Sequence, residues 1–223
     1  MENLALFPGR PRSDVDGRVF PVRGRRRINL TIRKAGWTRE KIMQLYLSHL
    51  ASPLGALTLV TDERQRVRAL EIGDRQARLH RNLREQYGTY EPHGADAPAA
   101  VEAAIARYFA GALEALDDLD VVTGGSESQR RAWAALRRIP AGRTATYGEI
   151  GKAMGIDDWR ASVDAGAAVG ANPVALIVPC HRVIGANGDL KGFAWGLQRK
   201  RWLLAHEHAI KPPETLPRTE PLF

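Results

Sequence analysis

The residue with the most suggestive chemistry is Cys180, the only cysteine among 223 residues. A lone cysteine cannot form an internal disulfide, so it is either a buried apolar residue or a nucleophile. An apolar run, residues 174–178, leads up to it, and Pro179 breaks that run directly before the thiol. His181 and Arg182 follow, and cationic or proton-accepting neighbours raise the thiolate fraction of a cysteine. The pattern favours a reactive cysteine.

A histidine beside a cysteine can act on it only in a suitable geometry. Adjacent side chains of an extended segment point to opposite faces, so His181 reaches Cys180 only through a turn or a bridging water. A basic histidine also needs a third group that fixes its tautomer. Glu207, at the end of the stretch that begins at Trp202, is the candidate for this group.

Composition and charge limit the class of protein. The sequence has 44% hydrophobic and 26% charged residues, and it shows no apolar run that would span a bilayer and no secretory signal. One cysteine suits a reducing cytoplasm and excludes a cysteine-rich zinc site. The net charge of +8 is uneven, with residues 1–42 at +7, 43–123 at −4 and 124–210 at +5. A basic C-terminal half suits a polyanionic partner, although solvated charged faces would give the same pattern.

Changes in composition and in apolar pattern along the sequence predict four segments. Residues 1–42 are rich in arginine, proline and glycine and have no amphipathic period, so we expect a disordered arm, unless translation starts at Met43. Residues 43–123 are predicted to form a small α/β domain, in which three strand-like stretches near residues 45–47, 57–59 and 67–72 form an antiparallel sheet. Apolar residues at every fourth position predict two helices there, near residues 79–87 and 101–109. Residues 211–223 are a proline-rich tail.

The segment 124–210 is predicted to be mainly helical. A first helix follows Ser126, and a second opens at Thr146, a plausible N-cap with Glu149 at its capping-box position. A third helix is expected at residues 159–171, capped by Asp157 or Asp158. Two short helices joined by a glycine-containing turn are typical of a helix-turn-helix. The small residues of the third helix would permit either close helix packing or a close approach to DNA.

These features together resemble the O6-alkylguanine-DNA alkyltransferases, also called methylated-DNA-protein-cysteine methyltransferases. The resemblance rests on Pro-Cys-His-Arg-Val at 179–183, on Gly-Ala-Asn-Pro at 170–173, and on Arg-Lys-x-Trp-Leu-Leu-x-His-Glu ending at Glu207. It implies a ribonuclease-H-like domain at 43–123 and a helix-turn-helix alkyltransferase domain at 124–210.

The resemblance also implies a role for each matching residue. Cys180 accepts the alkyl group, His181 acts as base through a water, and Glu207 orients His181. The implied substrate-binding residues are Tyr147, which helps rotate the nucleotide out and donates toward the departing base, the hinge residue Asn172, and Val183, Phe193 and Ala194, which contact the guanine. The implied DNA-binding residues are Arg160, Ala161, Ser162, Val163, Ala165, Gly166 and Arg182.

The sequence departs from the family's pattern at several of these places. Val163 stands where the recognition helix usually has an arginine that fills the gap left by the flipped base, and Arg160, one turn earlier, is a candidate substitute. Phe193 replaces a common tyrosine. Trp195 replaces a frequent glycine, and its bulk is expected to narrow the pocket to small alkyl groups.

The expected function is DNA repair by a single transfer of a methyl or small alkyl group from O6-alkylguanine in double-stranded DNA to Cys180, with O4-methylthymine as a possible second substrate. No metal or cofactor, no membrane and no obligate protein partner is expected, and the protein is expected to be a monomer that associates with the nucleoid. Two alternatives stay open at this point. One is a binding protein of the same fold with slow or no transfer, and the other is a cysteine hydrolase.

Overall fold

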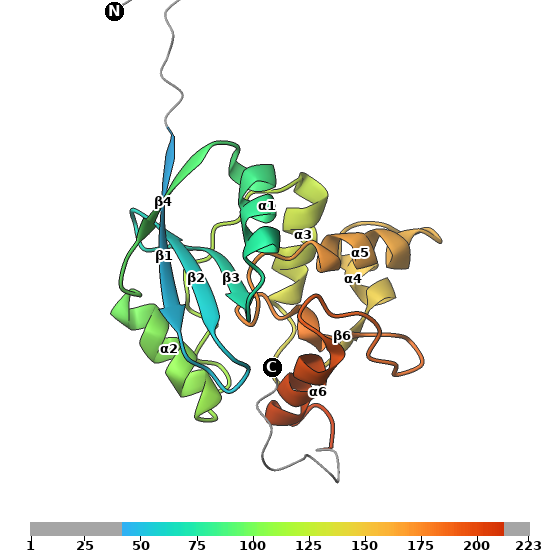
Figure 1. The fold of residues 1–223 in the computed structure, drawn as a ribbon. Helices are drawn as coiled ribbons and strands as arrows, with labels where there is room; N and C mark the ends of the chain where they lie inside the picture. The colour runs from blue at the N-terminus through green and yellow to red at the C-terminus, as the bar shows by residue number, and fades with distance from the viewer. Residues whose placement is uncertain (1–41, 212–223) are drawn as a thin grey trace, which may run out of the picture. The chain divides into compact units, whose positions relative to one another are not determined.

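The computed structural model describes residues 42–211, so the predicted arm up to residue 41 and the tail beyond residue 211 lie outside the described residues. In chain order the elements are β1 (Met43–Leu50), β2 (Leu57–Asp62), β3 (Val67–Ile72), α1 (Gln76–Tyr87), β4 (Tyr90–Gly94), α2 (Ala99–Phe109), α3 (Glu127–Leu136), β5 (Ala145–Thr146), α4 (Tyr147–Ala153), α5 (Ala161–Gly170), the short 3-10 helix η1 (Cys180–Arg182), β6 (Val183–Ile184) and α6 (Leu197–His206). Figure 1 shows their arrangement. No helix within these residues is long and apolar enough to cross a membrane.

The sheet has the strand order β3-β2-β1-β4. The three predicted strands are confirmed, and β2 runs antiparallel to both of its neighbours. The fourth strand was not predicted, and it pairs parallel to β1, so the sheet is mixed and the expectation of an antiparallel sheet is wrong in this respect. The fourth strand is mostly exposed and contains Pro92. An edge strand tolerates a proline and needs no apolar alternation, which explains why no strand pattern is visible in the sequence there.

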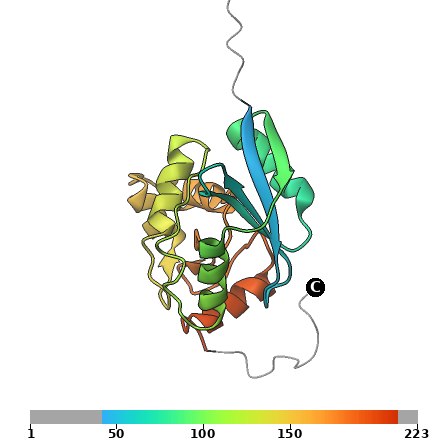
Figure 2. The ribbon, with the colours of Figure 1, turned by 90° about the vertical axis from the view of Figure 1, so that its left-hand side faces the viewer.

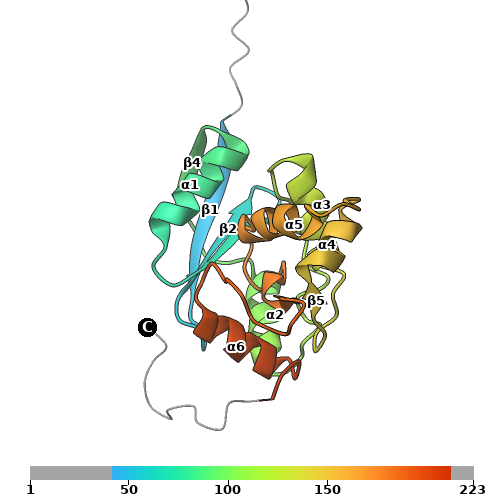
Figure 3. The same cartoon turned by 90° about the vertical axis from the view of Figure 1, so that its right-hand side faces the viewer.

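Two helices cover the two faces of the sheet, because alternate residues of a strand point to opposite faces. Leu79 and Leu83 of α1 pack with Val60 and Ala69 in one apolar cluster. The neighbouring strand residue Leu70 belongs instead to the larger cluster, which also contains buried residues of α2. The views in Figures 2 and 3 show α1 and α2 on opposite sides of the sheet. Both helices match the predicted positions.

In the C-terminal half, α3, α4 and α5 pack against one another (Figure 3). The predicted capping box of α4 is confirmed, since Thr146 Oγ1 accepts from the Glu149 N–H at 3.2 Å and the Glu149 carboxylate accepts from the Thr146 N–H at 2.6 Å. The third helix begins at Ala161, two residues later than predicted. Asp158 Oδ1 accepts a hydrogen bond from the Arg160 N–H at 2.8 Å, so Asp158 shapes the turn before the helix and does not cap it.

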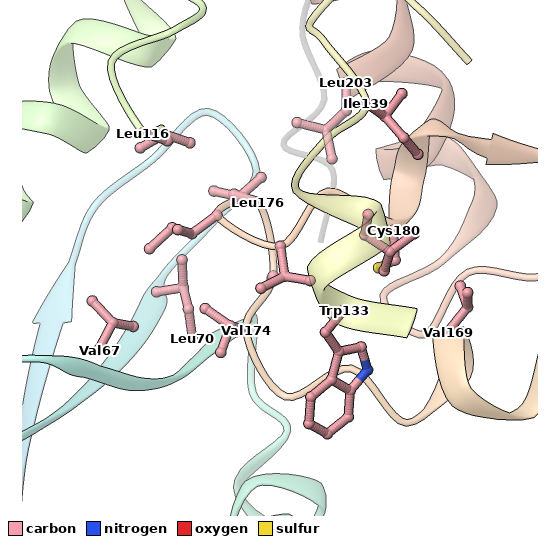
Figure 4. Packing of buried hydrophobic residues seen from close by; sticks show 14 of the residues in the cluster. Val67, Leu70, Leu116, Trp133, Ile139, Val169, Val174, Leu176, Cys180 and Leu203 are labelled. Atoms are coloured by element: carbon pink, nitrogen blue, oxygen red, sulfur yellow. The ribbon is translucent and has the colours of Figure 1, made fainter. Parts of the chain in front are cut away.

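The segment that leads to the cysteine is held against the sheet. The Leu70 N–H donates to the Pro173 carbonyl at 3.0 Å, and the Ala175 N–H donates to the Leu70 carbonyl at 2.9 Å. One core cluster therefore contains side chains from both predicted domains, and Figure 4 shows Leu70 beside Val174 with Cys180 in the same core. The boundary at residues 123 and 124 remains a prediction.

Candidate active site

The backbone turns sharply at the cysteine, as the proline before it predicted. Pro179 ends the extended segment, and residues 180–182 form η1, a single 3-10 turn in which the Arg182 N–H donates to the Pro179 carbonyl at 3.0 Å. The turn projects Cys180 toward a small cavity and carries His181 and Arg182 toward α6. The segment is therefore not extended at Cys180 and His181, and the two side chains leave a turn.

Asn172 fixes the thiol. Its Nδ2 lies 3.1 Å from Cys180 Sγ, and it also donates to the Val178 carbonyl at 2.8 Å. Its Oδ1 accepts from the Val174 N–H at 3.0 Å. Because Asn172 is almost completely buried, this one amide ties the end of α5 to both sides of the cysteine turn. Its role as a hinge remains a prediction.

Glu207 is the partner of His181, as the sequence predicted. Its Oε1 lies 2.8 Å from His181 Nε2, and the same oxygen accepts from the Tyr108 hydroxyl at 2.8 Å. Both partners of the pair are buried, at 1% exposure or less for each side chain. A carboxylate at Nε2 favours the tautomer with a proton there, which leaves Nδ1 as the acceptor. Nδ1 is buried and has no hydrogen-bond partner among residues 42–211.

Arg182 is not available to DNA, which contradicts its predicted role. Its Nε donates to Glu207 Oε2 at 2.8 Å and its Nη1 donates to the Ile139 carbonyl at 2.6 Å. Its side chain is 5% exposed, so the guanidinium is an internal partner of the carboxylate. Glu207, accepting from three different side chains, would be costly to bury without these donors.

Burial shifts the pKa values of the reacting groups in useful directions. It raises the pKa of the Cys180 thiol to about 11, although the Asn172 hydrogen bond and the charges of Lys200 and Arg78 act in the opposite direction. It lowers the pKa of His181, against the influence of Glu207. For Glu207 itself burial would raise the pKa, but the hydrogen bonds and charges of His181 and Arg182 outweigh burial, and the pKa lies well below its usual value. At neutral pH the site therefore holds a thiol beside a neutral imidazole.

A cavity of about 220 Å³ opens at the thiol. It is lined by Tyr147, Gly166, Val169, Gly170, Cys180, Gly192, Phe193 and Ala194. Three predicted substrate-binding residues, Tyr147, Phe193 and Ala194, are thus brought to one wall or another of this cavity. Another of the five, Val183, has a buried side chain, and its carbonyl accepts from Lys200 Nζ at 2.6 Å. A carbonyl has two lone pairs, so this bond leaves one acceptor site.

Lys200 was missed by the sequence analysis. Its ammonium is buried, where it donates to three carbonyls, those of Val183, Leu190 and Gly192. Burial lowers its pKa to about 8, although the nearby Cys180 acts in the opposite direction. A lysine on a helix usually indicates a solvated face, and only its place in the Arg-Lys-x-Trp-Leu-Leu motif signalled anything else.

The predicted DNA-binding residues divide between two sides of α5. Ser162 and Val163 are exposed and Gly166 lines the cavity, as a contact surface requires. Ala161 and Ala165 are buried against the rest of the protein, which contradicts their predicted contact with DNA. Residues four apart share a helix face, and this face packs on α4. Arg160 is exposed and pairs with Asp158 at 3.1 Å.

Trp195 does not line the cavity, so the expectation that its bulk narrows the pocket is wrong. Its indole is buried and its Nε1 donates to Glu71 of β3. Its ring packs against that of Phe193, a residue of the cavity wall, with 5.1 Å between the two ring centroids. Within residues 42–211 no group of three or more histidine, cysteine, aspartate and glutamate side chains is arranged to hold a metal ion.

A buried cysteine on a turn, a His-Glu pair and a cavity beside a helix with an exposed face of small side chains define a protein with a cysteine nucleophile. Comparisons with known proteins identify the kind. The family model described as 6-O-methylguanine DNA methyltransferase, DNA binding domain, matches residues 127–209. A methylated-DNA–protein-cysteine methyltransferase of Salmonella typhimurium is 43% identical over 168 residues, which are 74% of this chain and 97% of that protein.

Solved structures agree with this match. The crystal structure of Mycobacterium tuberculosis OGT in complex with DNA superposes with a TM-score of 0.60 at 35% identity, over 74% of this chain and 93% of that one. The O6-methylguanine-DNA methyltransferase of Pyrococcus kodakaraensis, at 18% identity and a TM-score of 0.52, shows the same fold. The chain belongs to the methylated-DNA–protein-cysteine methyltransferase family.

Proposed function

We propose that this protein repairs DNA by transferring a methyl or other small alkyl group from O6 of guanine to Sγ of Cys180, once per molecule. The observation that carries the proposal is the cavity that opens at the Cys180 thiol, next in the chain to an imidazole that a carboxylate already orients. The relatives are named for the same transfer, and one related structure contains DNA.

The chemistry follows from the protonation states of the site. Since burial keeps the thiol protonated at neutral pH, transfer needs a base, and the free lone pair of His181 Nδ1 can take the thiol proton through a bridging water. Glu207 accepts from Nε2 and stabilises the imidazolium that forms. The thiolate then attacks the alkyl carbon and the S–C bond forms. The C–O6 bond breaks, and its electron pair passes to O6 of the departing guanine.

Tyr147 is the proposed donor to the departing guanine. It lines the cavity, and burial and the neighbouring Cys180 raise its pKa, which keeps its hydroxyl protonated as a donor. The carbonyls of Cys180 and Val183 would accept from the guanine amino group, and the Ala194 N–H would face O6. No oxidant, metal or cofactor is needed for this displacement.

We infer that α4 and α5 act as a helix-turn-helix that delivers the base. Ser162 and Val163 lie on the exposed side of α5, and Gly166 and Gly170 line the cavity on the same helix. This arrangement suits a helix that enters the minor groove and holds the flipped nucleotide over the thiol. The proposal includes a ribonuclease-H-like N-terminal domain at 43–123, a monomeric protein, and action in the cytoplasm on nucleoid DNA.

Intact mass separates this function from its rivals. After incubation with a duplex that contains O6-methylguanine, the protein should gain the mass of one methyl group stoichiometrically, and the Cys180→Ser variant should gain none. A duplex with O4-methylthymine tests the second substrate. Tight lesion binding without a change of mass would instead support a binding protein of the same fold. Turnover of a simple ester by the unmodified protein would support a cysteine hydrolase, which the His-Glu pair alone also permits.

A further inference from the structure

A second buried ionic group lies beside the Cys-His-Glu site. Glu71, on β3, is 1% exposed, and its carboxylate accepts two bonds from Arg78 Nη1 at 2.9 and 2.7 Å. Arg78 lies in the first turn of α1, and its side chain is 14% exposed. Neither residue carries a role in the transfer described above.

Arg78 extends from this pair toward the active site. Its Nη2 donates to the backbone carbonyl of Asn172 at 3.0 Å. Its guanidinium carbon lies 4.7 Å from the centre of the Trp195 ring, a cation–π contact. The same indole donates from Nε1 to Glu71, so the carboxylate, the guanidinium and the indole form one closed group.

Each partner of this group touches a residue of the reaction site. Asn172, whose carbonyl accepts from Arg78, places its own amide nitrogen 3.1 Å from Cys180 Sγ. Trp195 packs edge-on against Phe193, with an angle of 63° between the rings, and Phe193 forms part of the cavity wall. One guanidinium on α1 thus lies a single residue away from both the thiol and the wall that faces the alkyl group.

We propose that Arg78, held by Glu71, is a positioning residue for alkyl transfer, which fixes the Asn172 amide on the Cys180 thiol and, through Trp195, the Phe193 wall. The inference rests on the proposed function only for the identity of the substrate, because the contacts of Arg78 are seen in the structure itself. The positive charge has a second effect in the same direction, because Arg78 is among the groups that oppose the burial of Cys180 and lower its pKa.

Stability alone gives a weak reason for such a pair. Buried ion pairs are often matched or exceeded in stability by apolar side chains of similar volume, because desolvation offsets their attraction. The planar fork of donors that reaches a carboxylate and a carbonyl at once is particular to arginine. A positioning role accounts for an arginine at this place, whereas a side chain that only filled space in the core would not need these hydrogen bonds.

The test compares Arg78→Met, Arg78→Lys and the control Arg81→Met. Arg81 is on the same helix but is exposed, with a loose pairing to Glu85 at 3.9 Å. Two rates are measured across pH for each folded variant: methyl transfer from an O6-methylguanine duplex, and alkylation of Cys180 by iodoacetamide. For Arg78→Met both rates should fall about tenfold at neutral pH, which corresponds to about one unit in the pH dependence of thiolate formation. Arg78→Lys should recover part of the loss, and Arg81→Met should behave as the unaltered protein.

The inference is overturned if a folded Arg78→Met keeps both rates and the same pH profile. If Arg78→Met does not fold, the double variant Glu71→Gln, Arg78→Met removes the buried charge along with its partner, and the same two rates decide. The iodoacetamide profile does not depend on DNA. It therefore tests Arg78 even if the unaltered protein transfers no methyl group, a result that would count against the proposed function alone.

Discussion

At the cysteine, burial acts on two neighbours in opposite directions. It raises the pKa of the Cys180 thiol to about 11 and lowers the pKa of His181. The thiol cannot ionise by itself at neutral pH, and the imidazole is neutral and able to accept its proton. Reactivity at this site thus depends on a proton transfer within the pair, not on a standing thiolate.

This predicts a specific pH profile for alkyl transfer. The rate should stay constant over the neutral range and decline only on the acid side, with a midpoint below the ordinary histidine pKa of about 6.5, because protonation of His181 removes the base. Stability should follow the same direction: the unfolded chain takes up the proton first, so stability from neutral His181 is complete above about 6.5 and is lost as pH falls through the lower folded pKa. Single-turnover rates and urea unfolding, each as a function of pH, measure the two. An acid limb centred above 6.5 would contradict this assignment.

The sequence predicted the site's main members but not all of its contacts. Cys180, His181 and Glu207 stand in recognisable motifs, and the structure pairs His181 with Glu207. Arg182 was expected to contact DNA because the family resemblance implied it. Its actual partner, Glu207, is 25 residues away in the chain. No local pattern shows whether an arginine pairs with a carboxylate of the protein or with a DNA phosphate. Lys200 escaped notice because its partners are backbone carbonyls 8 to 17 residues away, which no local pattern marks.

At the level of single helices, the contact between α4 and α5 depends on one glycine. A Cβ added at Gly151 would lie 2.3 Å from the carbonyl oxygen of Ala161, so the helices would have to separate. We expect Gly151→Ala to destabilise the protein by about 1 to 3 kcal/mol, despite the better helix propensity of alanine. In the same helix, Gly148 has only a distant neighbour at 4.0 Å, and Gly148→Ala should be neutral or stabilising. Equal urea midpoints for the two variants would refute the close approach.

The turn before α5 presents an unusual apolar surface. Trp159 is 82% exposed and Val163, one helical turn later, is 64% exposed. With α5 placed against DNA as proposed above, apolar side chains at this end of the helix gain from burial in a groove or against an unstacked base. Trp159→Ala should weaken binding to a lesion-containing duplex about tenfold, within the range of stacking on one base. Alkylation by iodoacetamide should be unchanged.

A control for this prediction lies on α6. Leu197 is 50% exposed and opens α6, so Leu197→Ala removes exposed apolar surface from a different helix. Fluorescence anisotropy of a labelled duplex measures both affinities. Equal losses in the two variants would show a general effect of surface hydrophobicity and no contact of Trp159 with DNA.

Elements were predictable where their signals are local. The capping box at Thr146 fixed the start of α4, and the apolar repeats located α1 and α2. The fourth strand was not predicted, because most of its side chains are exposed and its partner strand is 47 residues away in the chain. The start of α5 was also predicted wrongly, because Asp158 forms a local turn that resembles a helix cap in the sequence.

On the scale of the molecule, the segments that appeared as two domains in the sequence share one core. The pairing of Leu70 with the strand-like residues before Cys180 joins them, and Arg78 adds a side-chain link from α1 to Asn172. Such contacts between distant parts of the chain have no signature in composition or period. The resemblance to a family predicted the two segments but not the bonds between them.

The lone, buried Cys180 also has a practical consequence. Every thiol in a sample of this protein is an active-site thiol, because the 223 residues contain no other cysteine. The number of titratable thiols in denaturant therefore counts the molecules that have not yet reacted, and the rate of labelling in the native state reports how often the cavity admits a reagent. The number of free thiols in a sample thus equals the number of alkyl groups that the sample can still accept.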